Sequence, residues 1–270
     1  MVETCRQIGI AKSDTVEIET IMEGEGPTLV ILPSMGRDGY GDYDETVQHL
    51  VTRGLRVLRP QPRGIGSSRG PMESVGLEDL ADDIALVIQR LSDGPAVIVG
   101  HAFGHFVARM CALRHPDKVR GVVLAASAAS DTHLRFPEVW TAPDIACDLS
   151  RPKGDRLSAL ETAFFAPGND ASEWLEGWYP ETHRMQLAAE VPPGNWWSAG
   201  YAPLLELIAE YDPFKPKDRW GELGETFGPR VTSVVIEGAS HALFPEQPET
   251  CATAIADWVF ALLQVPSKPA

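Results

Sequence analysis

A histidine and an aspartate in the second half of the chain have the side chains of an acid–base pair. Asp212 lies in Tyr-Asp-Pro and His241 in Ala-Ser-His, and each follows an apolar run typical of a buried strand. A carboxylate fixes the tautomer of an imidazole and stabilises its charged form, so that the ring can take a proton from a hydroxyl group. A single histidine after a strand is usually a surface residue, and Asp-Pro is a common turn pair. The pair therefore indicates catalysis only together with a group on which it can act.

That group is expected in the segment Gly-His-Ala-Phe-Gly at residues 100–104. Three β-branched residues, 97–99, run into the segment, and a helix-like pattern follows it as far as His115. A strand that enters such a tight turn and leaves as a helix is typical of a nucleophile elbow, G-x-S-x-G. Here the central residue is Ala102, which has no atom that could attack a carbonyl carbon. The frame for a nucleophile is present, and the nucleophile itself is absent.

The segments around these residues alternate between strand and helix patterns. Strands are expected at 15–22 (an edge strand), 28–32, 55–60, 96–99, 119–126, 202–209 and 231–236. Helices are expected at 44–53, 77–91, 104–115 and 251–262. This order predicts an α/β fold with a mostly parallel sheet covered by helices on both faces. Ala102, Asp212 and His241 all follow strand ends, at the edge where open α/β sheets bind ligands.

Residues 130–197 differ in composition from the rest of the chain. They hold five of the seven tryptophans, together with many Pro and Gly breaks. In related folds an insertion at this point forms a helical cap, so we expect residues 130–197 to form a cap on a core made of residues 1–129 and 198–270. Most of its aromatic side chains should pack the cap onto the core, while a minority line a pocket.

The order of elbow, aspartate and histidine resembles that of the α/β-hydrolase superfamily, over almost the whole chain. The matching segments are 63–68, 100–104, 211–213 and 239–241. The resemblance implies that Ala102 stands at the nucleophile position, Asp212 is the acid and His241 the base. It further implies an oxyanion hole made by the backbone N–H groups of Phe103 and Met35. Pro33 and Ser34 replace the usual His-Gly of the loop that carries Met35.

The resemblance implies hydrolysis of an ester or lactone as the favoured activity, and the aromatic residues of the cap favour an apolar small molecule as the substrate. The residues expected to bind this substrate are Ser34, Arg37, Trp174, Trp178, Trp196 and Trp197. Arg37 could meet a substrate carboxylate, although a solvated loop arginine is the favoured interpretation. His101 and His105 are interpreted as structural residues beside the elbow. No metal or organic cofactor is expected, since the sequence has neither a cluster of metal ligands nor a phosphate-binding loop.

Ala102 is open to three interpretations. It could be an engineered Ser→Ala change that traps an intact substrate, since every other catalytic element is retained. It could be natural, in which case a His241–Asp212 base would act on water, or on the substrate of a lyase, an isomerase or a cofactor-free oxygenase. The fold could also have become a binding protein without turnover. This third interpretation ranks last, because decay usually spreads to the other catalytic residues.

Charge and composition limit the other functions. The chain has 270 residues and a formal net charge of −15, which argues against binding to nucleic acid or to anionic membrane surfaces. The four cysteines are scattered, and the N-terminal residues contain no apolar signal segment. We therefore expect a cytoplasmic protein whose partner is a small apolar or aromatic substrate, and a homodimer is left open.

Overall fold

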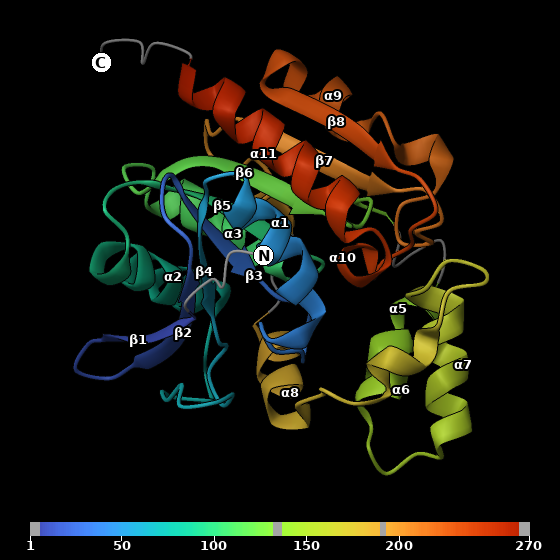
Figure 1. Cartoon of the computed structure of the whole chain (residues 1–270). Coiled ribbons are helices and arrows are strands. Elements are labelled where there is room, and N and C mark those ends of the chain that lie inside the picture. The colour runs from blue at the N-terminus through green and yellow to red at the C-terminus, as the bar shows by residue number, and fades with distance from the viewer. Residues whose placement is uncertain (1–5, 132–136, 190–192, 265–270) are drawn as a thin grey trace.

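The computed structural model describes residues 6–131, 137–189 and 193–264. One eight-stranded sheet runs through the molecule in the order β1-β2-β4-β3-β5-β6-β7-β8 (Figure 1). The strands are β1 (Gln7–Lys12), β2 (Glu17–Glu23), β3 (Thr28–Leu32), β4 (Arg56–Pro60), β5 (Ala96–His101), β6 (Val119–Ala125), β7 (Leu204–Ala209) and β8 (Val231–Ile236). The pairs β1–β2 and β2–β4 are antiparallel, and all other neighbours are parallel. The predicted α/β fold is confirmed.

The sequence prediction was wrong about the edge of the sheet. The strand expected at 15–22 corresponds to β2, but β1 lies outside it and is the edge strand. Ile8 and Ile10 of β1 are 66% and 50% exposed, so this strand buries little apolar surface. A strand with so little buried surface has only a weak hydrophobic pattern, and the sequence analysis therefore missed it.

Helices cover both faces of the sheet and create two apolar cores. On one face lie α2 (Leu77–Leu91) and α3 (Gly104–Arg114), which pack against each other. On the other face α1 (Asp44–Thr52) packs against α11 (Pro248–Gln264). The central strands are buried on both sides, which explains their continuous runs of Val, Ile and Leu. This rigid double-sided packing holds the strand ends that carry the predicted site.

The segment between β6 and β7 contains a separate group of helices. These are α5 (Pro137–Trp140), α6 (Ala142–Cys147), α7 (Lys153–Ala163) and α8 (Pro180–Ala188), with 3-10 turns η2 (Ala171–Leu175) and η3 (Pro193–Asn195). Figure 1 shows α5, α6 and α7 together at one side of the sheet. They share an apolar core that includes Leu160, Phe164 and Trp174. The cap boundaries at 130 and 197 stay a prediction, and residues 132–136 and 190–192 of that span lie outside the described residues.

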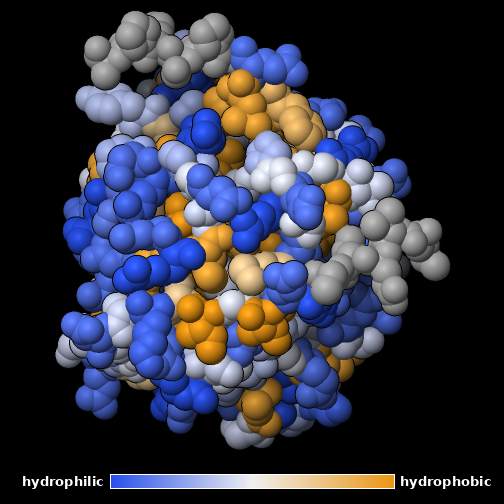
Figure 2. Space-filling model, turned by 60° about the vertical axis from the view of Figure 1, so that its left-hand side comes forward, coloured by the Kyte–Doolittle hydropathy of each residue, from blue (hydrophilic) through white to orange (hydrophobic). Residues whose placement is uncertain are grey.

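The remaining elements are short. They comprise α9 (Glu222–Phe227), α10 (Leu243–Glu246), and the 3-10 turns η1 (Gly41–Tyr43), η4 (Lys217–Arg219) and η5 (Gly228–Arg230). The face that Figure 2 shows is largely hydrophilic, with apolar side chains in small separate groups. Within the described residues, no helix has the length and apolar character needed to cross a membrane.

Candidate active site

Ala102 lies at the tip of a sharp turn between β5 and α3. Its φ of +48° is in the left-handed region, which residues with a Cβ atom rarely adopt. The turn is closed by hydrogen bonds from Ala102 N to Ala125 O (2.9 Å) and from His105 N to Ala102 O (2.9 Å). A Cβ atom at Gly100 would lie 2.5 Å from Gly104 O, and one at Gly104 would lie 2.5 Å from Leu32 O. Both glycines are therefore required by the close approach of strand and helix, as in a nucleophile elbow.

The structure brings His241 and Asp212 together at the ends of β8 and β7. The His241 Nδ1 atom lies 3.0 Å from Asp212 Oδ2 and 3.2 Å from Oδ1, and both side chains are buried. Asp212 Oδ1 also accepts a hydrogen bond from Phe214 N (2.9 Å). The Phe214 ring lies over the imidazole, with the two ring centroids 4.2 Å apart. A proton on Nδ1 satisfies the carboxylate and leaves Nε2 free to accept a proton.

His101 fixes the loop that carries His241. Its Nε2 atom donates to the backbone oxygen of His241 (2.7 Å), and its Nδ1 atom accepts from the Tyr43 hydroxyl (2.8 Å). Burial, followed by the nearby His241, lowers the pKa of His101 to about 3. The ring is therefore neutral across the pH range of ordinary assays. This arrangement agrees with the structural role predicted for His101.

The loop that carries Met35 is held by hydrogen bonds to α8 and to Tyr179, the residue before α8. Gly36 N donates to Gln186 Oε1 (2.7 Å), and Gly36 O accepts from Tyr179 N (2.8 Å). Neither the Met35 nor the Phe103 N–H donates to an acceptor within the described residues. Both residues border the same pocket.

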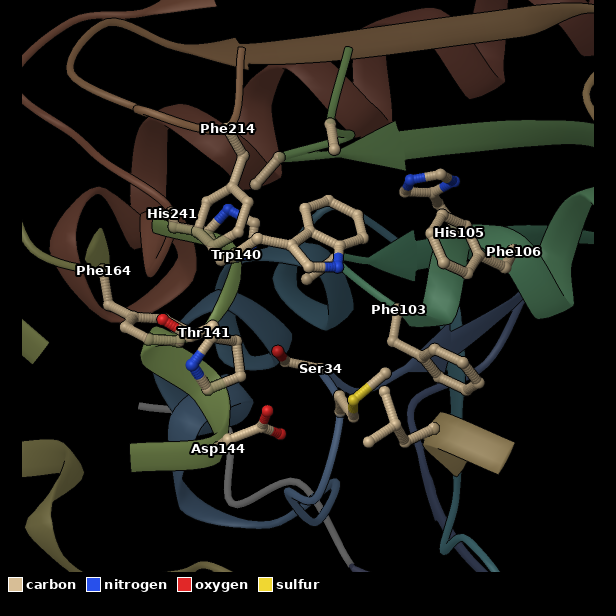
Figure 3. Close-up of a pocket in the computed structure, with 16 residues that line it drawn as sticks. Ser34, Phe103, His105, Phe106, Trp140, Thr141, Asp144, Phe164, Phe214 and His241 are labelled. Atoms are coloured by element: carbon tan, nitrogen blue, oxygen red, sulfur yellow. The ribbon is translucent and has the colours of Figure 1, made fainter. Parts of the chain in front are cut away.

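A cavity of about 110 Å³ connects these groups (Figure 3). Its wall contains Ala102, His241, Met35, Phe103 and Ser34, all of which the sequence analysis had selected. The other lining residues are His105, Phe106, Ala126, Ala128, Trp140, Thr141, Pro143, Asp144, Phe164, Leu187 and Phe214. Aromatic rings dominate the wall, and α3, α5, α6 and α8 all contribute to it. The chemistry accessible here is proton abstraction by an imidazole beside two free amide donors.

The structure places Arg37, Trp174 and Trp178 away from this cavity wall. Arg37 is only 3% exposed, which corrects the expectation of a solvated loop residue. Its guanidinium group pairs with Asp42 (2.6 Å) and lies over the rings of Trp174 (4.2 Å) and Trp178 (5.0 Å). These three side chains fasten the loop after β3 to the cap. Composition located the aromatic segment, but it could not show which rings turn inward.

Trp196 and Trp197 also lie outside the lining of the cavity. Trp196 packs on Phe106, with ring centroids 4.4 Å apart, and Trp197 lies under the guanidinium group of Arg109 at 4.3 Å. The residues that sequence reasoning missed include Trp140, Phe214 and Asp144. Phe214 carried one usable signal, because it lies only two residues after Asp212. Trp140 and Asp144 carried none that separated them from their neighbours.

This placement predicts different effects when two of the tryptophans are replaced. Trp174→Ala should lower the free energy of unfolding by about 3–5 kcal/mol, because a fully buried ring leaves a cavity. Trp140→Ala should cost much less stability but weaken binding of small apolar ligands, because that ring borders the pocket. Urea unfolding and ligand titration of both variants provide the measurement. If only the Trp174 variant bound the ligand more weakly, the assignment of Trp140 to the cavity wall and of Trp174 to the cap core would be contradicted.

Comparisons with known proteins agree with this geometry. Residues 27–148 match the family model described as alpha/beta hydrolase fold. The chain is 28% identical to a pyrethroid hydrolase of Sphingobium wenxiniae, covering 81% of this chain and 83% of that protein. It is also 28% identical to a pimeloyl-acyl-carrier-protein methyl ester esterase of Aeromonas hydrophila, covering 84% and 92%. The structure of a thermophilic esterase from Thermogutta terrifontis superposes with a TM-score of 0.75 at 21% identity, covering 95% and 98%.

The strand order, the strained turn after β5 and these similarities agree with one another. The chain has the α/β-hydrolase fold, and a family model of that fold matches residues 27–148. The proteins that it resembles include a methyl ester esterase.

Proposed function

We propose that the cavity is the substrate site of a hydrolase for esters or lactones of small apolar molecules. In this proposal His241, oriented by Asp212, is the general base, and Ala102 occupies the nucleophile position. One observation carries the proposal: Ala102, Met35, Phe103 and His241 all border one cavity, and buried Asp212 pairs with His241 behind the cavity wall. The aromatic wall supports an apolar substrate.

The positions of these groups suggest how the reaction proceeds. A substrate carbonyl oxygen would accept hydrogen bonds from the Met35 and Phe103 amides, next to the N-terminus of α3, which favours negative charge. Because Ala102 has no hydroxyl group, no acyl-enzyme can form through it. His241 Nε2 would instead take a proton from water while the water oxygen bonds to the carbonyl carbon. The tetrahedral intermediate then expels the alkoxide, which takes the proton back from His241.

A fluorophosphonate probe tests this site without knowledge of the natural substrate. The native protein should remain unlabelled, and Ala102→Ser should become labelled, because His241 would activate the new hydroxyl. Adding His241→Ala to that variant should abolish the labelling. A folded Ala102→Ser variant that stays unlabelled would refute the assignment of Ala102 and His241.

A further inference from the structure

The cavity has a single acidic side chain among its described lining residues, Asp144 of α6. Its side chain is 55% exposed, and its carboxylate points into the pocket on the side facing Ser34 (Figure 3). Oδ1 accepts a hydrogen bond from His183 Nε2 at 2.7 Å. Within the described residues, Oδ2 has no hydrogen-bond partner and remains free to accept one from a ligand.

His183 positions the carboxylate of Asp144. The Nε2 atom of His183 faces Oδ1 of the carboxylate, whereas its Nδ1 atom is buried and has no partner within the described residues. With a proton on Nε2 the ring donates a hydrogen bond to Oδ1. This contact fixes one oxygen of the carboxylate at the cavity wall.

The wall next to Asp144 suits an organic cation. Trp140, Phe164 and Phe214 border the cavity, and the ring centroids of Trp140 and Phe214 lie 6.1 Å apart. The faces of aromatic rings carry negative potential and attract ammonium groups. No lysine or arginine is among the described residues that line the cavity. A carboxylate and aromatic rings that line one cavity, without a lysine or arginine in the described lining, favour a ligand that carries a positive charge.

The opposite wall has the opposite polarity. The N-terminus of α3 faces the cavity at Phe103 and carries partial positive charge. Arg109 lies one turn after His105 on this helix. Burial lowers the pKa of His105 most, and the positive charge of Arg109 is the next cause. A bound ester would therefore turn its carbonyl oxygen to the elbow and a cationic group to Asp144.

We propose that Asp144 and the aromatic rings of the same cavity form a subsite for an ammonium group, so that the substrate is an ester or lactone whose otherwise apolar body bears one amine. The assignment of an ester or lactone as the substrate rests on the proposed function. The cation subsite itself can be tested by binding alone, without turnover.

The test uses choline and its uncharged carbon isostere, 3,3-dimethylbutan-1-ol, which have nearly the same shape. Calorimetric titration of the native protein should show choline binding at least about 10-fold more tightly. Asp144→Asn should remove most of that preference by weakening choline alone, because the amide retains the hydrogen bond to His183 without the charge. Asp155→Asn, an exposed change of equal charge on α7, should leave both affinities unchanged.

Several outcomes would overturn the proposal. Equal affinity for the two probes in the native protein would do so without any variant, as would the absence of choline binding. An equal loss for both probes in Asp144→Asn would mean that Asp144 shapes the pocket or binds a neutral hydroxyl group. The fluorophosphonate experiment is independent of these results. If the native protein binds choline but the Ala102→Ser variant is not labelled, the cation subsite is retained and the esterase proposal is rejected. If the Ala102→Ser variant is labelled but the native protein does not bind choline, the esterase proposal is retained and the cation subsite is rejected.

Discussion

Replacing Ala102 by Ser is expected to raise kcat/KM for a small apolar ester by at least about 10³-fold. Removing the nucleophile from a serine protease costs about 10⁶-fold in kcat, which sets the upper limit of the recovery. The remaining parts of the site are in place, since His241 is paired with Asp212 and the Met35 and Phe103 amides are free. The gain should be accompanied by a burst of product, because an acyl-enzyme now forms.

The backbone should accept this substitution without new strain. Ala102 already has a Cβ atom at φ +48°, so the cost of the left-handed conformation is present in the native protein. The added hydroxyl group points toward a cavity that Ala102 already borders. Stability measured by thermal unfolding should therefore change little.

Ala126 provides a matched control for this prediction. It also has a φ of +48° and borders the same cavity, at the end of β6. Ala126→Ser adds the same hydroxyl group to the same pocket, but outside the turn between β5 and α3. It should produce neither labelling nor a burst. A similar gain in both variants would indicate nonspecific chemistry of an added hydroxyl group and would contradict the nucleophile position.

The residues at strand ends were predictable because topology determines their place. In a parallel sheet the carboxyl ends of neighbouring strands share one edge, so Ala102, Asp212 and His241 had to lie close together once the strands were recognised. The spacing of Gly100 and Gly104 likewise follows from the contact between strand and helix. Local sequence therefore contained most of the information about this part of the site.

The cap residues were not predictable in the same way. Trp174 and Trp140 have the same side chain and lie in the same segment, yet one fills the cap core and the other borders the cavity. Their orientation depends on how short helices pack against one another, and composition carries no information on that. Arg37 was misjudged for a related reason, because its partners Asp42 and Trp174 are brought together only by the fold.

Asp212→Asn in the Ala102→Ser background is expected to lower kcat by about 10³- to 10⁴-fold with little change in KM. The amide that replaces the carboxylate can still accept the hydrogen bond from Phe214 N through its side-chain oxygen, but it presents an NH₂ group to His241 Nδ1. Nδ1 must then accept, so the proton moves to Nε2. The imidazole in that tautomer cannot take a proton from the serine hydroxyl group.

The size of this loss separates a catalytic role for the pair from a structural one. Asp148→Asn removes the same charge from a side chain that bonds Ser150 at the surface, and it should leave kcat unchanged. Choline affinity should be the same in the Asp212 and Asp148 variants, because neither change touches Asp144. A loss of choline binding together with kcat would mean that Asp212 supports the pocket as a whole. A tenfold or smaller fall in kcat would mean that His241 acts without a required tautomer, and the general-base assignment would then lack its main physical support.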